Sequence, residues 1–413
     1  MINGVKGATD FYPEEEAVKQ AVFSSLKRTA ESFGFRGIAT PVIENFELLS
    51  KKQGDEIRSQ IFTLEKKGDE ELAMRAEFTP SFARLFIEKQ KMLVKPVKWF
   101  CIDRVWRYER PQAGRQREFY QFNVELYGSP EPVADAEIIS LAVDALKNLG
   151  LKEADFVVKV NSRKLLQGIA EDFAGKGGAE ELIRVIDKKS KVSAVDFRKM
   201  LEGAGVKECG KLIKLLEADN LKEVKVSSPL AKEGLDELKK VLGLLQYKCV
   251  KASISTARGL SYYTGTVFEI FDKDEKLRSV CGGGRYDSMI MNLGGEPAPA
   301  VGFGMGYSTL SLLLAEKKAL PAPVFGPDIF IAVIDEDKKA LEVASVLRRN
   351  YSVVVNLIKR NLGNQIKYAN AVNAKNLLVI GPEEAKTGKA VLKNLKTGKE
   401  KEIKLSDIGS EKL

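Results

Sequence analysis

Apolar and polar positions along the first half of the chain alternate between helical and strand-like spacing. Apolar residues three or four positions apart predict a helix, whereas alternation or short apolar runs predict strands. Helix start and stop signals set the expected helix boundaries, because Gly34 follows the first apolar stripe and Thr79-Pro80 begins a second one. The elements expected before residue 90 are a helix at 14–33, an extended run at 35–44, a hairpin of 61–65 with 71–75, and a helix at 79–89.

Two aromatic-rich apolar runs, 97–110 and 118–127, flank an arginine-rich turn at 111–117 and predict a long antiparallel hairpin. From 163 to 247 leucine and lysine recur at helical spacing with few aromatics, which predicts a helical insertion. The other elements expected before residue 317 are a helix at 134–149, a strand at 156–161, strands at 249–257, 263–272 and 278–285, and a helix at 309–316.

The proline-rich segment 320–327 predicts a linker. Beyond it, strand and helix patterns alternate and end in a hairpin near 396–398, so the sequence predicts a small α/β domain there. The expected order is strand 328–334, helix 337–349, strand 351–357, helix 362–373 and strand 376–380.

The amino-acid composition excludes several kinds of catalytic and metal-binding site. The 413-residue chain contains no histidine, which excludes a Ser-His or Cys-His nucleophile, a histidine base and an imidazole metal ligand. The four cysteines, at positions 101, 209, 249 and 281, form no C-x-x-C pair, which argues against zinc and against a disulfide framework. A net charge of +9 fits a polyanionic partner such as nucleic acid, although a lysine-rich surface also serves solubility. The N-terminus does not resemble a signal peptide and no apolar run is long enough for a membrane helix, so we expect a cytoplasmic protein.

The predicted hairpin carries five arginines within fourteen residues, from Arg104 to Arg117. Guanidinium groups bind phosphate bidentately and stay charged, so this cluster indicates a phosphate ligand, with a solvated, salt-bridged hairpin as the alternative. Period-two spacing would place Arg107 and Glu109 on one face, and Phe119, Gln121 and Glu125 likewise. A Gln and a Glu within an apolar run are hard to explain as surface residues.

Three further segments are candidates for ligand binding, and each alone also has a structural explanation. An arginine before paired tyrosines, in Arg258-Gly-Leu-Ser-Tyr262-Tyr263, suits an anion beside a planar group. The glycines of Cys281-Gly-Gly-Gly-Arg285-Tyr286 would let backbone amides approach a ligand, and Gly302-Phe-Gly304-Met-Gly306 leads into a helix N-terminus. The alternatives are a turn with core tyrosines and close strand–helix packing.

Taken together and in this order, these segments resemble the histidyl-tRNA synthetase family of class II, with an archaeal-like pattern. The region from Gly34 to Pro41, the 104–128 hairpin and residues 300–314 are similar to motifs 1, 2 and 3 of the class. The segments at 258–265 and 281–287 resemble the two histidine-specific motifs, and Arg75 to Pro80 resembles the segment that binds the substrate amino group. The resemblance implies an antiparallel sheet flanked by helices in a catalytic core of 1–162 and 248–320, a helical insertion at 163–247 and an anticodon-binding domain at 328–413.

The same resemblance implies roles for particular residues. Arg258 and Arg107 are the expected catalytic residues. The residues expected to bind histidine are Glu77, Thr79, Arg107, Gln121, Glu125, Arg258, Tyr262, Tyr263 and Tyr286. Those expected to bind ATP are Arg107, Glu109, Arg115, Phe119 and Arg285, and those expected to bind tRNA are Gln112, Arg117, Lys359, Arg360 and Lys367. Mg²⁺ would arrive with ATP, with Glu109 as its one protein position, and neither zinc nor a prosthetic group is expected.

Two positions depart from the family pattern: Thr309 replaces an arginine of motif 3, and Gly7 to Asp10 lack an arginine. Arg115 or Arg117 could then bind the γ-phosphate in place of the missing arginine. The expected activity is ATP-dependent charging of tRNA(His) with L-histidine by a homodimer without membrane association. The alternatives are a synthetase-like regulatory subunit of ATP phosphoribosyltransferase, which does not charge tRNA, and a basic RNA-binding protein. Because the chain has no histidine, we expect any acid limb of kcat/KM between about pH 5 and 7.5 to come from the substrate ring.

Overall fold

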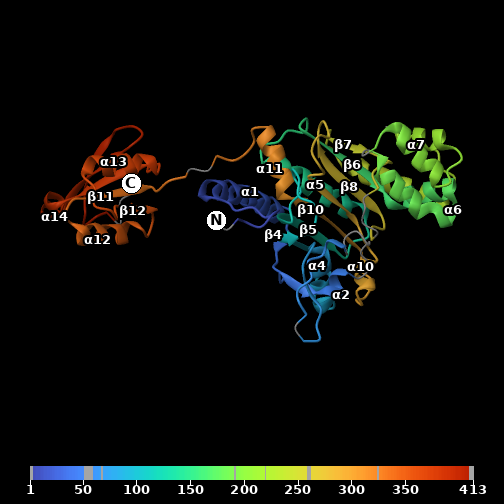
Figure 1. Ribbon diagram of the computed structural model, residues 1–413, viewed down its shortest axis with the longest axis horizontal. Helices are drawn as coiled ribbons and strands as arrows, with labels where there is room; N and C mark the ends of the chain where they lie inside the picture. The colour runs from blue at the N-terminus through green and yellow to red at the C-terminus, as the bar shows by residue number, and fades with distance from the viewer. Residues whose placement is uncertain are drawn as a thin grey trace. The chain divides into compact units, whose positions relative to one another are not determined.

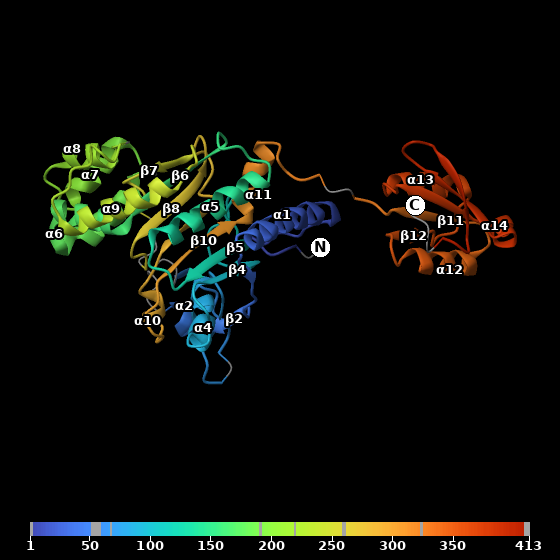
Figure 2. The same ribbon diagram turned by 180° about the vertical axis from the view of Figure 1, so that it is seen from behind.

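The computed structural model describes residues 3–50, 59–66, 68–189, 192–218, 220–257, 262–322 and 325–408. The chain divides into a larger unit that includes Val18–Pro321 and a smaller one that includes Ala322–Leu413. Each unit has buried apolar clusters of its own. Figures 1 and 2 show the ribbon of the chain from two opposite sides. No helix in the described part of the chain is long and apolar enough to cross a membrane.

An eight-stranded sheet forms the centre of the larger unit, in the order β1-β4-β5-β10-β9-β8-β6-β7. Its strands pair antiparallel except at the two edges, where β1 runs parallel to β4 and β7 runs parallel to β6. The predicted antiparallel sheet is therefore confirmed. The strand bounds are β1 Arg36–Gly37, β4 Val97–Trp106, β5 Glu118–Tyr127, β6 Phe156–Ser162, β7 Val250–Ala252, β8 Thr266–Asp272, β9 Cys281–Arg285 and β10 Ala300–Gly306.

Helices cover one face of this sheet. Side chains alternate between faces along a strand, so Phe122, Val124 and Leu126 of β5 and Val301, Phe303 and Met305 of β10 enter the main core together. The apolar stripe of the N-terminal helix packs into the same core, as its spacing predicted, and Gly34 follows that helix at a φ of 78°. The helices in this layer are α1 Pro13–Ser32, α5 Pro132–Asn148 and α11 Tyr307–Glu316.

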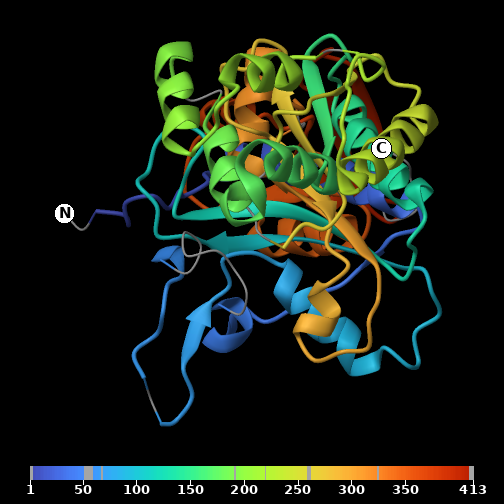
Figure 3. The ribbon, with the colours of Figure 1, turned by 90° about the vertical axis from the view of Figure 1, so that its right-hand side faces the viewer.

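Shorter elements lie on the other side of β4 and β5, where α2 and α4 are seen in Figures 1 and 3. Phe78, Phe82 and Phe86 form a second apolar cluster there with the opposite face of the sheet. The expected hairpin exists, because the amides of Leu64 and Met74 donate to Leu72 and Phe62, but its second strand also pairs with residues 43–45. The elements are β2 Ile43–Asn45, α2 Phe46–Ser50, β3 Leu72–Met74, α4 Thr79–Lys89 and α10 Met289–Asn292.

The leucine- and lysine-rich segment is helical, as predicted, and lies at the β6–β7 end of the sheet (Figures 1 and 2). Serine side chains at positions 162, 193 and 228 cap three of its helices by accepting a backbone N–H. Its buried leucines belong to the same core as the sheet, and its status as a separate domain stays a prediction. The helices are α6 Arg163–Asp187, α7 Ala194–Gly203, α8 Cys209–Leu216 and α9 Pro229–Leu244.

The smaller unit is a five-stranded mixed sheet in the order β12-β11-β13-β14-β15. Strand β11 pairs in parallel with β12 and β13, as the predicted alternation of strands and helices implies. Strand β14 pairs antiparallel with β13 and β15, and β14 with β15 forms the predicted final hairpin. The bounds are β11 Ile329–Val333, α12 Asp337–Leu347, β12 Val353–Val355, α13 Leu362–Ala371, β13 Asn376–Ile380, α14 Pro382–Thr387, β14 Lys389–Asn394 and β15 Glu400–Lys404.

Candidate functional site

A broad pocket of about 830 Å³ opens over the side chains of Phe119, Gln121 and Asn123 on β5, and Ser308 and Thr309 at the start of α11 also line it. That volume lies in the range of small-molecule sites. The pocket takes side chains at every second position of β5, together with the glycines of β10 that stand beside them. The structure therefore brings together most of the residues that the sequence singled out. The predicted site residues that line it are Glu77, Thr79, Arg107, Glu109, Arg115, Phe119, Gln121, Tyr262, Tyr263 and Tyr286.

The glycines of β10 make room for two polar side chains of β5. Gly302 stands opposite Glu125 in the ladder, and a Cβ at Gly302 would collide with Oε2 of that residue. A Cβ at Gly304 would lie 2.5 Å from Nε2 of Gln121. Both glycines lie inside the sheet ladder, paired with β5 on one side and with β9 on the other. Their function is to keep the floor of the pocket free of side chains.

Glu125 is not among the residues that line the pocket, but it contacts Thr79 and Asn123, which do, and only 1% of its surface is exposed. Its Oε1 accepts hydrogen bonds from Thr79 Oγ1 at 2.9 Å and from Asn123 Nδ2 at 2.7 Å. Burial raises the pKa of Glu125 to about 8, although these two hydrogen bonds act in the opposite direction. Its Oε2 and the Oε1 of Gln121 have no hydrogen-bond partner in the described part of the chain. Two buried acceptors, one on the lining residue Gln121 and one on Glu125 next to the pocket, suit a ligand that brings N–H donors.

Three tyrosines form an aromatic wall beside this floor. The rings of Tyr262 and Tyr263 are 4.9 Å apart, and those of Tyr262 and Tyr286 are 5.7 Å apart in a T-shaped arrangement. The hydroxyl of Tyr262 donates to Glu77 Oε2 at 3.3 Å. The hydroxyl of Tyr286 is buried and has no partner among the described residues. The wall therefore combines ring faces with a polar group that a ligand can reach.

The turn between β4 and β5 carries cationic groups at the pocket edge. We expected Arg107 and Glu109 to share one face of a strand. Strand β4 ends at Trp106, however, so both residues lie in the turn that follows it. Arg107 Nε donates to the carbonyl of Ala76 at 2.8 Å, and its guanidinium carbon lies 5.7 Å from the centre of the Phe119 ring. Arg115 forms an ion pair with Glu109. An aromatic ring beside arginines suits a base and its phosphates.

Arg285 does not line the pocket, unlike the other residues expected to bind ATP. Its Nη2 lies 2.5 Å from Asp135 Oδ2 of α5, and its Nη1 donates to the carbonyl of Ser129 at 3.0 Å. The reason is the alternation of β9, since Arg285 shares a face with Cys281 and Gly283, and Cys281 enters the main core. Tyr286, one residue further, lines the pocket instead.

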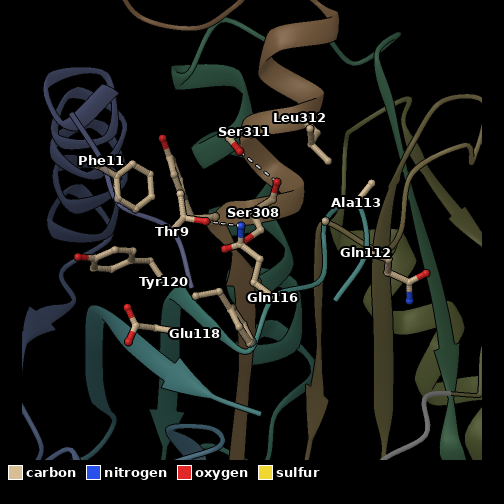
Figure 4. A pocket seen from close by; sticks show the side chains of 13 residues that line it. Thr9, Phe11, Gln112, Ala113, Gln116, Glu118, Tyr120, Ser308, Ser311 and Leu312 are labelled. Carbon is tan, nitrogen blue, oxygen red and sulfur yellow. Dashed lines mark hydrogen bonds between the residues drawn. The ribbon is translucent and has the colours of Figure 1, made fainter. Parts of the chain in front are cut away.

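A smaller pocket of about 320 Å³ lies between the N-terminal segment, the β4–β5 turn and α11 (Figure 4). Gln112, expected to bind tRNA, lines it. Gln116 Nε2 donates to Thr9 Oγ1 at 2.7 Å across it. Thr309, at the position of the absent arginine, uses its hydroxyl to donate to the carbonyl of Gly114 at 3.2 Å.

Arg117 is not among the residues that line the large pocket. Arg117 packs its guanidinium 4.2 Å from the centre of the Tyr108 ring. In the smaller unit, Lys359 and Lys367 are exposed, and Arg360 lies 4.5 Å from the Tyr368 ring centre. Arg258 lies outside the residues that the structure describes. The described residues contain no cluster of three or more His, Cys, Asp or Glu side chains that could hold a metal ion.

Asn123 was missed by the sequence analysis, although a signal was present. It is a polar residue in an apolar strand, two positions from both Gln121 and Glu125, so period two places all three on one face. Glu269 and Arg278 also line the pocket, and their positions follow only from the pairing of β8, β9 and β10.

Comparison with known proteins agrees with this geometry. A protein-family model described as Histidyl-tRNA synthetase matches residues 7–310, and one described as Anticodon binding domain matches residues 328–411. The chain is 38% identical to a histidine–tRNA ligase of Natronomonas pharaonis, covering 98% of this chain and 96% of that protein. It is 37% identical to a histidine–tRNA ligase of Pyrococcus horikoshii, with 99% and 98% covered. The crystal structure of histidyl-tRNA synthetase from Nostoc sp. superposes with a TM-score of 0.80 at 25% identity, covering 99% of this chain and 98% of that one.

Proposed function

The chain belongs to the histidyl-tRNA synthetase family, and from this premise we propose that it activates L-histidine with ATP and transfers the histidyl group to the 3′ end of tRNA(His). In the first step a carboxylate oxygen of histidine attacks the α-phosphorus of ATP, and pyrophosphate leaves. In the second step a 3′-terminal hydroxyl of the tRNA attacks the histidyl carbonyl, and AMP leaves. No protein imidazole takes part, because the chain has no histidine.

The observation that carries this proposal is the buried Glu125 with its unpartnered Oε2. That oxygen accepts a hydrogen bond from a ring N–H of the substrate, while Tyr263 and Tyr286 enclose the ring. Glu77, Thr79 and Gln121 hold the α-ammonium group, and Tyr262 orients Glu77 through its hydroxyl. A planar ring with N–H groups fits this arrangement better than an aliphatic side chain, which would leave the buried acceptors unpaired.

ATP lies beside the β4–β5 turn in the proposed complex. Phe119 stacks on adenine, Arg107 binds the α-phosphate and the substrate carboxylate, and Arg258 neutralises charge on the α-phosphate as it is attacked. Arg115 completes the ATP contacts on the phosphate side. Reactions of this kind depend mainly on positioning and charge neutralisation, which arginines supply.

Mg²⁺ enters with ATP in this proposal, and the residues present fit it. Glu109 is a carboxylate at the pocket edge with 7% of its side chain exposed, and magnesium commonly uses one or two carboxylates together with substrate phosphates and water. When bound, the ion neutralises phosphate charge. Neither zinc nor a prosthetic group has a role in this reaction.

For the tRNA, Gln112 and Arg117 in the β4–β5 turn would contact the acceptor end, and Lys359, Arg360 and Lys367 would contact the anticodon arm. We place the domains at 1–162 with 248–320, at 163–247 and at 328–413. We also propose that the protein is a cytoplasmic homodimer. Sedimentation that shows only monomer at micromolar concentration would contradict the dimer.

The decisive experiment is ATP–pyrophosphate exchange with each amino acid, followed by charging of tRNA. Exchange stimulated by histidine, together with histidyl-tRNA(His) formation, is the expected result. A regulatory subunit that does not charge tRNA, or an RNA-binding protein without catalysis, would fail both assays. Exchange stimulated by a different amino acid would reject the specificity assigned to Glu125.

A further inference from the structure

The cations that line the large pocket differ in whether they already have partners. The described lining residues of this kind are Arg107, Arg115, Lys159, Lys189 and Arg278. Arg107 donates to a backbone carbonyl, and the next three form ion pairs with Glu109, Glu275 and Glu217. Arg278 is exposed at the pocket edge and has no hydrogen bond or ion pair with any described residue. It is therefore the guanidinium most available to an incoming anion.

The acidic residues of the β8–β9 turn pair with other groups, which explains why Arg278 has no ion-pair partner. Asp274 forms an ion pair with Lys276 at 3.0 Å, and Glu275 forms one with Lys159 at 2.6 Å. Asp272 accepts the backbone amides of Lys276 and Leu277. The acids nearest to Arg278 in the chain are thus all engaged with other groups.

The strand register places Arg278 level with the proposed adenine position. Gly306 of β10 stands opposite Gln121 of β5, and on its other side its amide donates to the carbonyl of Val280. Strands β5 and β9 run in the same direction, because both are antiparallel to β10. Phe119 is two residues before Gln121 and Arg278 is two residues before Val280. Both residues therefore lie near the same end of the sheet, on opposite sides of β10, and both line the pocket.

Between them, the start of α11 supplies no positive charge. Its first residues are Tyr307, Ser308 and Thr309, and the Thr309 hydroxyl already donates to the carbonyl of Gly114. A nucleotide whose base stacks on Phe119 therefore finds polar but neutral groups above β10 and a free guanidinium beyond them. The triphosphate chain of such a nucleotide carries the negative charge that this guanidinium would neutralise.

We propose that Arg278 binds the terminal phosphates of ATP, and pyrophosphate in the reverse reaction. This inference rests on the proposed function and identifies a contact for the part of ATP that leaves. A guanidinium suits that role because it stays charged and donates two parallel hydrogen bonds to phosphate oxygens. Since the β- and γ-phosphates are absent from the adenylate, Arg278 contributes to the binding of ATP and of pyrophosphate but not to that of the adenylate.

The test compares Arg278→Ala with Lys273→Ala, which removes one positive charge from the same turn at a residue that does not line the pocket. We expect Arg278→Ala to raise the KM for ATP and for pyrophosphate by about tenfold or more, the range for losing a hydrogen bond to a charged group. The KM for histidine and the affinity for a non-hydrolysable histidyl-adenylate analogue should stay within about twofold of wild type. Arg278→Lys should keep part of the affinity for ATP and pyrophosphate, and Lys273→Ala should resemble wild type.

Two results would overturn the assignment. Wild-type KM values for ATP and pyrophosphate in Arg278→Ala would mean that this guanidinium does not bind phosphate. Equal loss of affinity for ATP and for the adenylate analogue would mean that Arg278 supports the pocket structurally. Histidine-dependent exchange by the wild-type protein is measured first, so a failure of the proposed function itself is seen separately.

Discussion

The hydroxyl of Thr79, at the start of α4, donates a 2.9 Å hydrogen bond to Oε1 of Glu125 near the C-terminal end of β5. The pair joins two segments that are 46 residues apart and fixes one carboxylate oxygen. The other oxygen has no described partner and is left for a ligand. The acid and the residue that orients it therefore come from different layers of the fold.

The pH dependence of kcat/KM for histidine should be bell-shaped. Burial raises the pKa of Glu125 to about 8, and the substrate ring titrates near about 6.5. A buried site favours a neutral pair, so the complex holds one proton between carboxyl and ring. Below about 6.5 that pair carries one proton too many, and above about 8 it carries one too few, so the rate falls on both sides.

Glu125→Gln and a triazole analogue of histidine separate the two limbs. The Glu125→Gln variant should lose the part of the alkaline limb near pH 8 that comes from this carboxyl. The triazole analogue should lose the acid limb near 6.5, because the chain has no histidine and the substrate ring is the only imidazole present. The α-amino group of the substrate titrates in both enzymes, so the comparison isolates Glu125. An unchanged alkaline limb in Glu125→Gln would show that the carboxyl does not titrate there.

Gly302→Ala should weaken histidine binding selectively. The added Cβ would collide with Glu125 Oε2 and would lie 2.4 Å from the carbonyl oxygen of Val124, so both the carboxylate and the adjoining backbone of β5 must shift. We expect the KM for histidine to rise roughly tenfold, the scale of forcing one methyl group into a filled site, with a smaller change for ATP. The matched control is Gly306→Ala in the same strand, where a Cβ would meet nothing within 4 Å. Similar effects of both substitutions on the KM for histidine would reject the steric explanation.

Arg285→Ala should lower stability and leave the KM for ATP near wild type. The guanidinium is buried against Asp135, and removing one member of a buried ion pair costs about 3–5 kcal/mol because a charge is left uncompensated. Thermal unfolding should shift down by on the order of 10 °C. Lys276→Ala, which breaks an exposed pair with Asp274, should leave the midpoint nearly unchanged. A stable Arg285→Ala protein with weakened ATP binding would restore the original assignment.

Arg258→Ala should lower kcat for exchange by about 100-fold or more, which is the scale of losing one preorganised donor in the transition state. The KM for histidine should change less, because the binding contacts remain. The measurement is steady-state exchange with both substrates varied. An unchanged kcat with a large shift in KM would make Arg258 a binding residue only.

Deleting residues 328–413 should reduce tRNA charging far more than ATP–pyrophosphate exchange. The pocket is built from residues before 310, whereas the family's anticodon-binding pattern covers 328–411. Charging by the full chain should also fall as salt rises, because phosphate contacts release counterions. Parallel loss of both activities in a truncated protein that stays folded would argue against this division of labour.

The sequence alone determined the elements and much of the site, for a local reason. Period two in β5 fixes which of its side chains share a face, so Phe119, Gln121 and Glu125 could be grouped from spacing. The helical stripe of α1 and the strand–helix alternation after residue 327 are likewise properties of neighbouring residues, and the structure confirms them. Polar residues inside an apolar run already indicated that this face binds something.

Only the tertiary structure decided which partners meet across strands. Three features depend on strand pairing and on layers that join segments far apart in the sequence. They are the ion pair of Arg285 with Asp135, the space that Gly302 leaves for Glu125, and the unpaired guanidinium of Arg278. The pKa of Glu125 has the same origin, since it is set by the burial that the assembled sheet and α4 impose on that carboxyl. Local spacing fixes the face on which a side chain lies, whereas its partners and its exposure to water are fixed when the layers pack.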